Sequence, residues 1–185
     1  MRRDQLEHLL RAAAAITGDR EIIVVGSQAI LASIPDDRLP IEAVRSIEAD
    51  LAFLDDPDDE KSTKVDGAIG EDSLFHRTHR VYAHGVGLET ARLPKGWRRR
   101  LVSLETASMA PGRGLCLERH DLVASKLVAG RSKDLEFAEA LVAAELIRLP
   151  TLLRRVDRLD GVSGASLERA RQWVMRQIDR SVPTS

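Results

Sequence analysis

The chain has few of the features that mark several classes of protein. It holds one cysteine, Cys116, among 185 residues, so an internal disulfide is excluded and a thiolate zinc site lacks partners. No apolar run approaches the roughly 18 residues of a membrane-spanning segment. Aromatic residues make up only 3%, which argues against stacking of bases along an extended single strand. The formal net charge is only −1, although basic residues gather in two stretches.

The start of the chain lacks the pattern of a secretory signal. Residues 1–7 lead into an amphipathic segment with two early acids, whereas a signal has a basic region, an apolar core and a small-residue cleavage site. The balance of 43% hydrophobic and 31% charged residues is ordinary for a globular protein. We therefore expect a soluble, cytoplasmic protein with a folded core and no membrane partner.

The hydrophobic pattern predicts an α+β fold with a mixed sheet of about five strands and flanking helices. Short apolar or alternating runs bounded by glycine and proline predict strands at residues 21–26, 46–54, 80–86, 87–93 and 99–104. Helical periodicity predicts helices at residues 4–17, 27–34 and 55–69. A loop at 109–114 follows the last predicted strand.

After residue 112 the pattern becomes helical. Glycine and proline separate four amphipathic segments, at residues 120–129, 132–146, 151–158 and 165–179. We therefore divide the chain into a core at 1–112 and a helical C-terminal subdomain at 113–185. A site that draws on both parts is expected to lie in the cleft between them.

The first motif with chemical meaning is the turn at Gly26 and Ser27. Glycine lets the backbone approach a ligand closely, and the start of the following helix offers free N–H groups to a phosphate. The Ser27 hydroxyl adds a donor. The same residues also suit an ordinary strand-to-helix connection. P-loop and Rossmann signatures, with their longer glycine patterns, are absent from the sequence.

The second motif is the acidic pair Glu48 and Asp50 on the predicted strand 46–54. Residues two apart in a strand point to the same face, so the two carboxylates are expected to share a divalent cation. Without a cation they repel each other, which favours binding of Mg²⁺ or shifted pKa values. The alternative is an edge strand whose acids face water.

The third motif lies in the helical part. Lys126 stands in an otherwise apolar helix, and Arg131, Lys133 and Asp134 follow across a glycine break. Charges placed in this way could neutralise a triphosphate and supply a further carboxylate. The alternative is a solvated helix junction in which Asp134 is an acid near a helix N-terminus.

The order of these motifs resembles the nucleotidyltransferase superfamily typified by polymerase β. Its pattern is an apolar strand, Gly-Ser, a helix and then an acid-x-acid strand, matched here by residues 24–27 and 47–51. Glu48 departs from the pattern, because Asp is usual there. The third motif looks like that of the AbiEii and MenT-like toxin nucleotidyltransferases. This resemblance implies a nucleotidyltransferase fold followed by a C-terminal helical bundle.

The resemblance also implies an activity. It implies transfer of a nucleotide from an NTP to an acceptor, with release of pyrophosphate and with Mg²⁺ or Mn²⁺ as cofactor. The implied acceptor is tRNA, and the implied biological role is that of a toxin with an antitoxin protein as partner. Two other classes remain open: a catalytically degenerate module that binds a protein or nucleotide, and an enzyme that modifies a protein or small molecule.

The resemblance assigns roles to individual residues. Glu48 and Asp50 become the metal ligands, and Asp134 the downstream essential acid. The implied nucleotide-binding residues are Gly26, Ser27, Lys126 and Arg131. Glu89, on the predicted strand 87–93, is a rival for the third carboxylate.

Two basic stretches are candidates for guiding an RNA backbone. The first is Arg92, Lys95, Arg98, Arg99 and Arg100, and the second is Arg148, Arg154, Arg155 and Arg158. A solvated surface is the alternative interpretation of both.

Overall fold

The computed structural model describes residues 1–181. Within this range a mixed sheet of five strands has the order β3-β2-β1-β5-β4. The strands are β1 Glu21–Val24, β2 Glu48–Ala52, β3 Tyr82–Gly85, β4 Val102–Leu104 and β5 Arg113–Cys116. The pairs β2–β3 and β1–β5 are parallel, whereas β1–β2 and β4–β5 are antiparallel. The predicted α+β fold with a mixed five-stranded sheet is confirmed.

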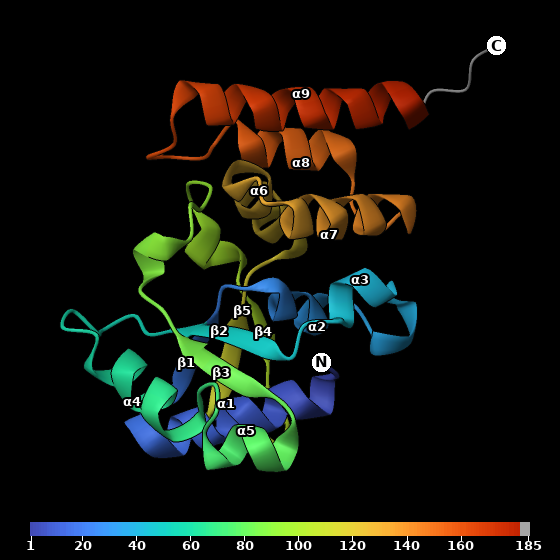
Figure 1. The fold of residues 1–185 in the computed structure, drawn as a ribbon. Helices are drawn as coiled ribbons and strands as arrows, with labels where there is room; N and C mark the ends of the chain where they lie inside the picture. The colour runs from blue at the N-terminus through green and yellow to red at the C-terminus, as the bar shows by residue number, and fades with distance from the viewer. Residues whose placement is uncertain (182–185) are drawn as a thin grey trace.

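The helices lie at both ends of the sheet (Figure 1). Those before β5 are α1 Arg3–Thr17, α2 Ile30–Ser33, α3 Ile41–Val44, α4 Glu60–Ile69 and α5 Leu74–His79. Those after it are α6 Arg119–Ala129, α7 Ser132–Ala143, α8 Leu149–Val156 and α9 Gly164–Ser181. Among the described residues, no helix combines the length and apolarity needed to cross a bilayer.

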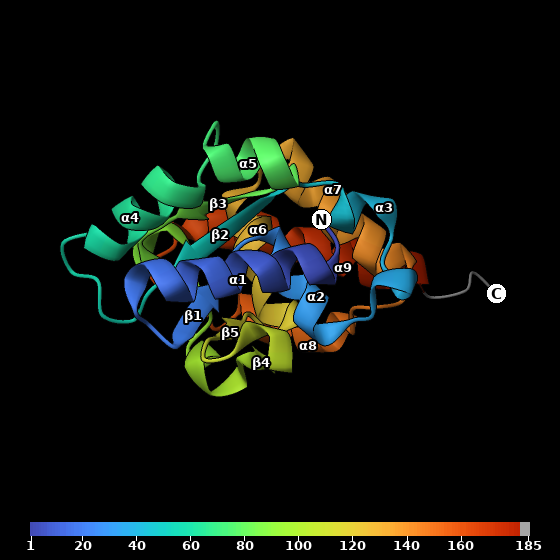
Figure 2. The ribbon, with the colours of Figure 1, turned by 90° about the horizontal axis from the view of Figure 1, so that it is seen from below.

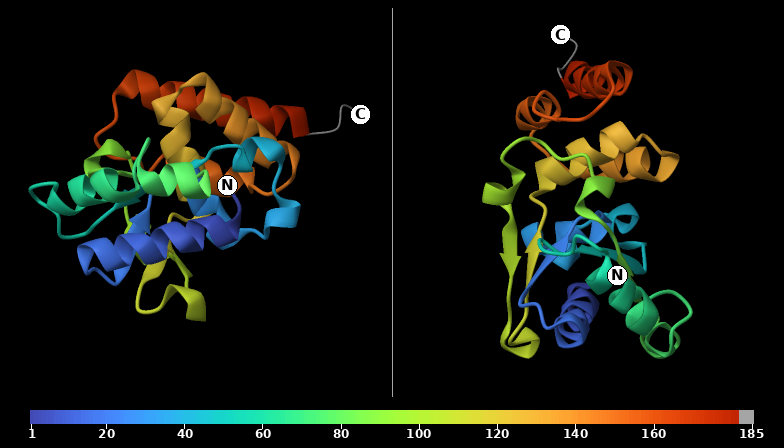
Figure 3. Two further views of the ribbon diagram at one scale, coloured as in Figure 1. Left: turned by 60° about the horizontal axis from the view of Figure 1, so that its bottom comes forward. Right: turned by 90° about the vertical axis from the view of Figure 1, so that its left-hand side faces the viewer.

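Most of these helices form two layers, and α2 and α3 lie between the layers, with α3 against α7 and α2 against α6. Seen from below, α1 runs across the strands with α4 and α5 beside it (Figure 2). At the opposite end, α6 and α7 lie next to the sheet, and α8 and α9 stack above them (Figure 3). The C-terminal helical region is therefore a second layer that faces one end of the strands.

The hydrophobic core surrounds β1, the central strand of the sheet. Ile22, Ile23 and Val24 of β1 are fully buried, because β1 has a strand on each side and helices beyond. Leu6 and Leu10 of α1, four residues apart, pack into the same core. Burial of such side chains stabilises the fold by about 1.5–3 kcal/mol each.

Two predicted features of the sheet were wrong. Residues 87–93 form no strand; instead Leu88–Thr90 make a 3₁₀ turn, in which the Thr90 hydroxyl donates to the Gly87 carbonyl at 2.7 Å. Conversely, β5 lies partly in the segment predicted as loop 109–114. It pairs in parallel with β1, from Glu21 opposite Arg113 to Val24 opposite Cys116. The division of the chain at residue 112 stays a prediction, and β5 on its far side belongs to the sheet.

Cys116 is a buried apolar side chain. It lies at the end of β5 with none of its surface exposed. Burial raises the pKa of its thiol to about 12, so almost no thiolate forms near neutral pH.

Asp121 joins the sheet region to the helical region. This buried residue of α6 accepts from Arg100 Nε at 2.8 Å, and Arg155 Nε of α8 lies 2.9 Å from its other oxygen. Arg100 also donates to the carbonyls of Pro94 and Lys95. The prediction that Arg100 and Arg155 form part of a basic surface was therefore wrong, since both guanidinium groups face a buried carboxylate.

Replacing Asp121 should destabilise the fold. Asp121→Asn leaves two largely buried guanidinium groups facing a neutral amide, at an expected cost of about 3 kcal/mol. The measurement is the free energy of unfolding in urea at pH 7. Asp157→Asn is the matched control, because its ion pair with Arg171 is exposed and contributes about 0–1 kcal/mol. Equal losses in the free energy of unfolding for the two variants would contradict the role of Asp121 as the link between the sheet region and the helical region.

Candidate active site

A cleft of about 420 Å³ lies between the sheet and helices α6 and α7. Seven of the residues that the sequence predicted for the site line this cleft: Gly26, Ser27, Glu48, Asp50, Lys126, Arg131 and Asp134. Gly26 and Ser27 follow the end of β1, Glu48 and Asp50 lie in β2, and the other three come from α6, α7 and the turn between them. The tertiary structure thus brings two distant stretches of sequence to one place.

The contact between Gly26 and Asp50 sets the floor of the cleft. Antiparallel pairing of β1 with β2 lets the Val25 N–H donate to the Asp50 carbonyl at 3.1 Å. A Cβ on Gly26 would lie 1.9 Å from Asp50 Oδ2 and 2.7 Å from its Cγ. The φ of Gly26, −84°, is open to any residue, so glycine is required here for space alone.

The turn after Gly26 differs from the predicted helix 27–34. Ser27–Ala29 form a 3₁₀ turn, and the α-helix that follows has only four residues, Ile30–Ser33. Gly26 holds the N-cap position of this turn. Such a short helix has a weak macrodipole, so any anion at this turn would depend on local N–H groups and the Ser27 hydroxyl.

The acidic pair faces a histidine. Glu48 and Asp50 point to one side of β2, and His84 of β3 lies opposite Asp50 in the parallel register. His84 Nδ1 is 3.3 Å from Glu48 Oε1 and 3.8 Å from Asp50 Oδ1. One ligand atom from each of the three residues falls within 4.8 Å of the others. Two carboxylates and an imidazole are a donor set that fits a divalent metal ion.

The opposite wall of the cleft carries a cluster of charge around Asp134. Lys126 Nζ donates to Asp134 Oδ1 at 2.9 Å, and Arg131 Nε donates to Oδ2 at 2.7 Å. The Asp134 carboxyl is fully buried, whereas Arg131 is 63% exposed. Burial alone would raise the pKa of Asp134, but the hydrogen bonds from Arg131 and Lys126 outweigh it and lower this pKa.

Both oxygens of Asp134 are therefore engaged by cations, which suits a group that orients Lys126 and Arg131. The hydrogen bond to Asp134 raises the pKa of Arg131, and the negative charges of Asp50 and Glu48 add smaller contributions. Arg131 thus links the two walls of the cleft electrostatically. Lys126 also lies over the Phe137 ring, 5.1 Å from its centroid, which limits the positions open to its ammonium group.

Glu89 lies outside this cleft. It is exposed in the 3₁₀ turn Leu88–Thr90 and lines a different hollow beside the acidic loop 55–59. The residue opposite Asp50 on the neighbouring strand is instead a histidine, His84 of β3. The alternation of apolar and polar residues along 81–85 indicates in the sequence that His84 faces away from the core, because Val81 and Ala83 are buried and His84 lies on the other face. The sequence does not show which strand lies beside His84.

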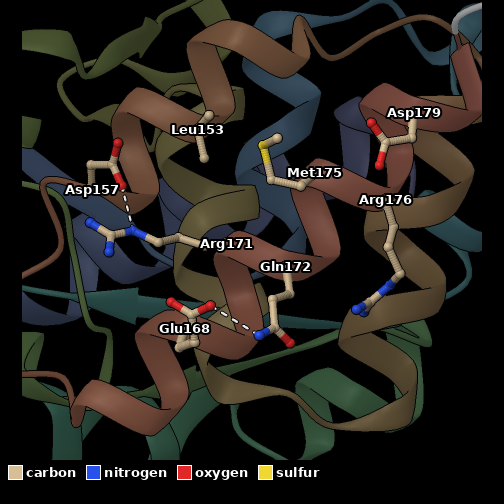
Figure 4. A pocket seen from close by; sticks show the side chains of 8 residues that line it. All are labelled: Leu153, Asp157, Glu168, Arg171, Gln172, Met175, Arg176 and Asp179. Atoms are coloured by element: carbon tan, nitrogen blue, oxygen red, sulfur yellow. Dashed lines mark hydrogen bonds and ion pairs between the residues drawn. The ribbon is translucent and has the colours of Figure 1, made fainter.

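A second hollow lies on the surface of the helical layer, between α8 and α9 (Figure 4). Two of its polar pairs already satisfy each other: Arg171 with Asp157 at 2.7 Å, and Gln172 with Glu168 at 2.9 Å. None of the predicted site residues lines it. The cleft at Asp50 is therefore the candidate active site.

Comparison with known proteins places the chain in a family. Residues 4–179 match the family described as "nucleotidyltransferase of unknown function (DUF6036)", and the chain belongs to it. The match spans both the sheet and the helical layer. No curated protein and no solved structure matches the chain. The family supports the superfamily resemblance and leaves the toxin branch as a proposal.

A methyl group at Gly26 should disturb the floor of the cleft. Gly26→Ala places Cβ against the Asp50 carboxylate and at 3.0 Å from Asp50 Cβ, so the Asp50 side chain or the strands must shift, at a cost of about 1–3 kcal/mol. The free energy of unfolding measures this loss. Gly67→Ala is the control, since a Cβ at this position of α4 would meet nothing within 4 Å and alanine favours a helix by about 0.5–1 kcal/mol. A Gly26→Ala variant as stable as the wild type would contradict the tight contact.

Proposed function

We propose that this chain is a metal-dependent nucleotidyltransferase that moves a nucleotide from an NTP to an acceptor and releases pyrophosphate. The observation that carries the proposal is the Gly26–Asp50 contact, with Lys126 and Arg131 across the same cleft. A phosphate-binding turn, a pair of metal-binding acids and two cations then surround one volume. Family membership supports this reaction class.

In this proposal Glu48 and Asp50 hold Mg²⁺ or Mn²⁺ against the phosphates of the NTP. The metal would supply Lewis-acid polarisation of phosphoryl oxygens and neutralise charge that develops in the transition state. The carboxylates are about one-third exposed, 32% and 35%, so an ion is accessible from the cleft. Their shared face on β2 supports the assignment.

The remaining residues would position the triphosphate. The Gly26 N–H and the Ser27 hydroxyl bind the β- and γ-phosphates, and Lys126 and Arg131 neutralise the charge of the leaving pyrophosphate. Asp134 holds both cations in place. The acceptor hydroxyl oxygen bonds to the α-phosphorus, the bond from that phosphorus to the β-phosphate oxygen breaks, and the hydroxyl proton passes to water. Catalysis is then chiefly positioning and charge neutralisation.

The acceptor we propose is RNA, in particular tRNA. The exposed residues Arg92 and Arg98 lie in the segment that follows the cleft-lining Thr90 and Ala91. The Lys95 N–H donates to the Arg158 carbonyl at 2.8 Å, so the two basic stretches of the sequence lie side by side. Exposed guanidinium groups suit contacts with a phosphate backbone. As in the toxin enzymes that the third motif resembles, the proposed role is that of a toxin held by an antitoxin protein.

The catalytic proposal predicts dependence on Asp50. Wild-type protein, incubated with each α-³²P-labelled NTP, Mn²⁺ or Mg²⁺ and total cellular RNA and protein, should transfer label to an acceptor. Asp50→Asn should lower the rate on the order of 100-fold or more, because a ligand of the metal is lost. Asp58→Asn, which changes an exposed acid outside the cleft, should leave the rate unchanged. Equal rates for the Asp50 and Asp58 variants would contradict the proposal, as would no transfer from any NTP.

The acceptor and the biological role are tested separately. We expect the label in the tRNA fraction, and we expect expression of the wild-type chain, but not of Asp50→Asn, to stop bacterial growth. Label found in protein alone would overturn the RNA acceptor. Equal growth arrest by both versions would overturn catalysis as the cause of toxicity.

A further inference from the structure

His84 belongs to the acid pair by backbone register. Parallel pairing of β2 and β3 sets Glu48 opposite Tyr82 and Asp50 opposite His84. Because aligned residues of neighbouring strands share a face, the imidazole lies on the side of the carboxylates. Val81 and Ala83 fill the core on the other side. Two adjoining strands therefore fix the three groups relative to one another.

The separations suit three donors around one ion. His84 Nδ1 lies 3.3 Å from Glu48 Oε1 and 3.8 Å from Asp50 Oδ1. Adjacent ligands of an octahedral ion with bonds of about 2.1 Å stand roughly 3 Å apart. All three ligand atoms lie within 4.8 Å of one another, so rotation of these partly exposed side chains would bring them to the separations that a bound ion requires.

The other histidines are engaged elsewhere. His120 is buried between the Glu118 carboxylate and the Arg148 N–H. The ring of His76 accepts from the Asp72 N–H, and His79 packs edge-to-face against His8 with ring centroids 4.4 Å apart. Within residues 1–181, the one cluster of three or more metal-ligating side chains is the one that includes His84.

We propose that His84 is a ligand of the metal ion, together with Glu48 and Asp50, and that it shifts the preference of the site from Mg²⁺ toward Mn²⁺. The proposal rests on the metal site of the proposed function. A neutral imidazole gives the ligand set a charge of −2, where a third carboxylate would give −3. Mg²⁺ strongly favours oxygen ligands, whereas transition metals accept imidazole nitrogen. The identity of the residue opposite Asp50 then decides which ion the cleft selects.

The coordination can be observed without any enzymatic activity. Mn²⁺ is titrated into the intact protein, alone and with α,β-methylene-ATP, and the bound ion is examined by electron spin echo envelope modulation. We expect a ¹⁴N modulation from a directly bound imidazole in the wild-type protein. His84→Ala should remove this signal and weaken Mn²⁺ binding by about tenfold or more.

The carboxylate variant tests the selectivity. His84→Asp should lack the ¹⁴N signal yet still bind Mn²⁺, and Mg²⁺ should displace Mn²⁺ from it at about tenfold lower concentration than from the wild type. His79→Ala is the matched control, a histidine outside the cleft, and should behave as wild type. Circular dichroism confirms the fold of each variant; since half of the His84 side chain is exposed, its replacement should be tolerated.

The outcomes separate this inference from the proposed function. One set of outcomes begins with loss of Mn²⁺ binding in Asp50→Asn. If the wild type then shows no ¹⁴N modulation, or if His84→Ala binds Mn²⁺ as tightly as the wild type, His84 is not a ligand. The metal site of the proposed function is retained in that case. If the wild type binds no Mn²⁺ with or without the nucleotide analogue, or if Asp50→Asn binds normally, both the inference and the proposed metal site are overturned.

Discussion

The side chain of Asp50 lies directly against the backbone of Gly26, and the arrangement of the cleft depends on this contact. It exists because β1 and β2 run antiparallel and are joined by a hydrogen bond between Val25 and Asp50. With no side chain at Gly26, a carboxylate can occupy the space beside the turn. In the proposed function, a phosphate held by the turn lies next to the acids.

The opposite wall is built on different principles. Here a fully buried carboxylate, Asp134, is neutralised by Lys126 and Arg131. A buried charge is costly unless it is paired and hydrogen-bonded, so the cluster fixes the position of both cations. The contact of Asp121 with Arg100 and Arg155 follows the same rule away from the cleft. Asp121 thus secures the helical layer to the sheet, while Asp134 orders the face that this layer turns to the cleft.

Much of the architecture was visible in the sequence, because it depends on local periodicity. Helix α1, the buried strand β1 and the long helices after β5 follow from the spacing of apolar residues. The predictions were wrong in segments whose local sequence pattern differs from the structure that they adopt through contacts with distant segments. The segment at Gly114 has the local pattern of a loop, yet it becomes a strand through pairing with β1. Residues 87–93 include strand-like residues, yet Leu88–Thr90 close into a 3₁₀ turn.

The parts of the candidate site were predicted from residue type, short spacing and a motif order that resembles the nucleotidyltransferase superfamily. They are a glycine turn, two acids on one face of a strand, and a lysine, an arginine and an aspartate at a helix junction. Three further features required the folded chain: Asp134 pairs with two cations, Glu89 lies outside the cleft, and His84 stands beside Asp50. They depend on strand order and register, which are set by packing between distant segments. No local pattern in the chain encodes which strand will become the neighbour of β2.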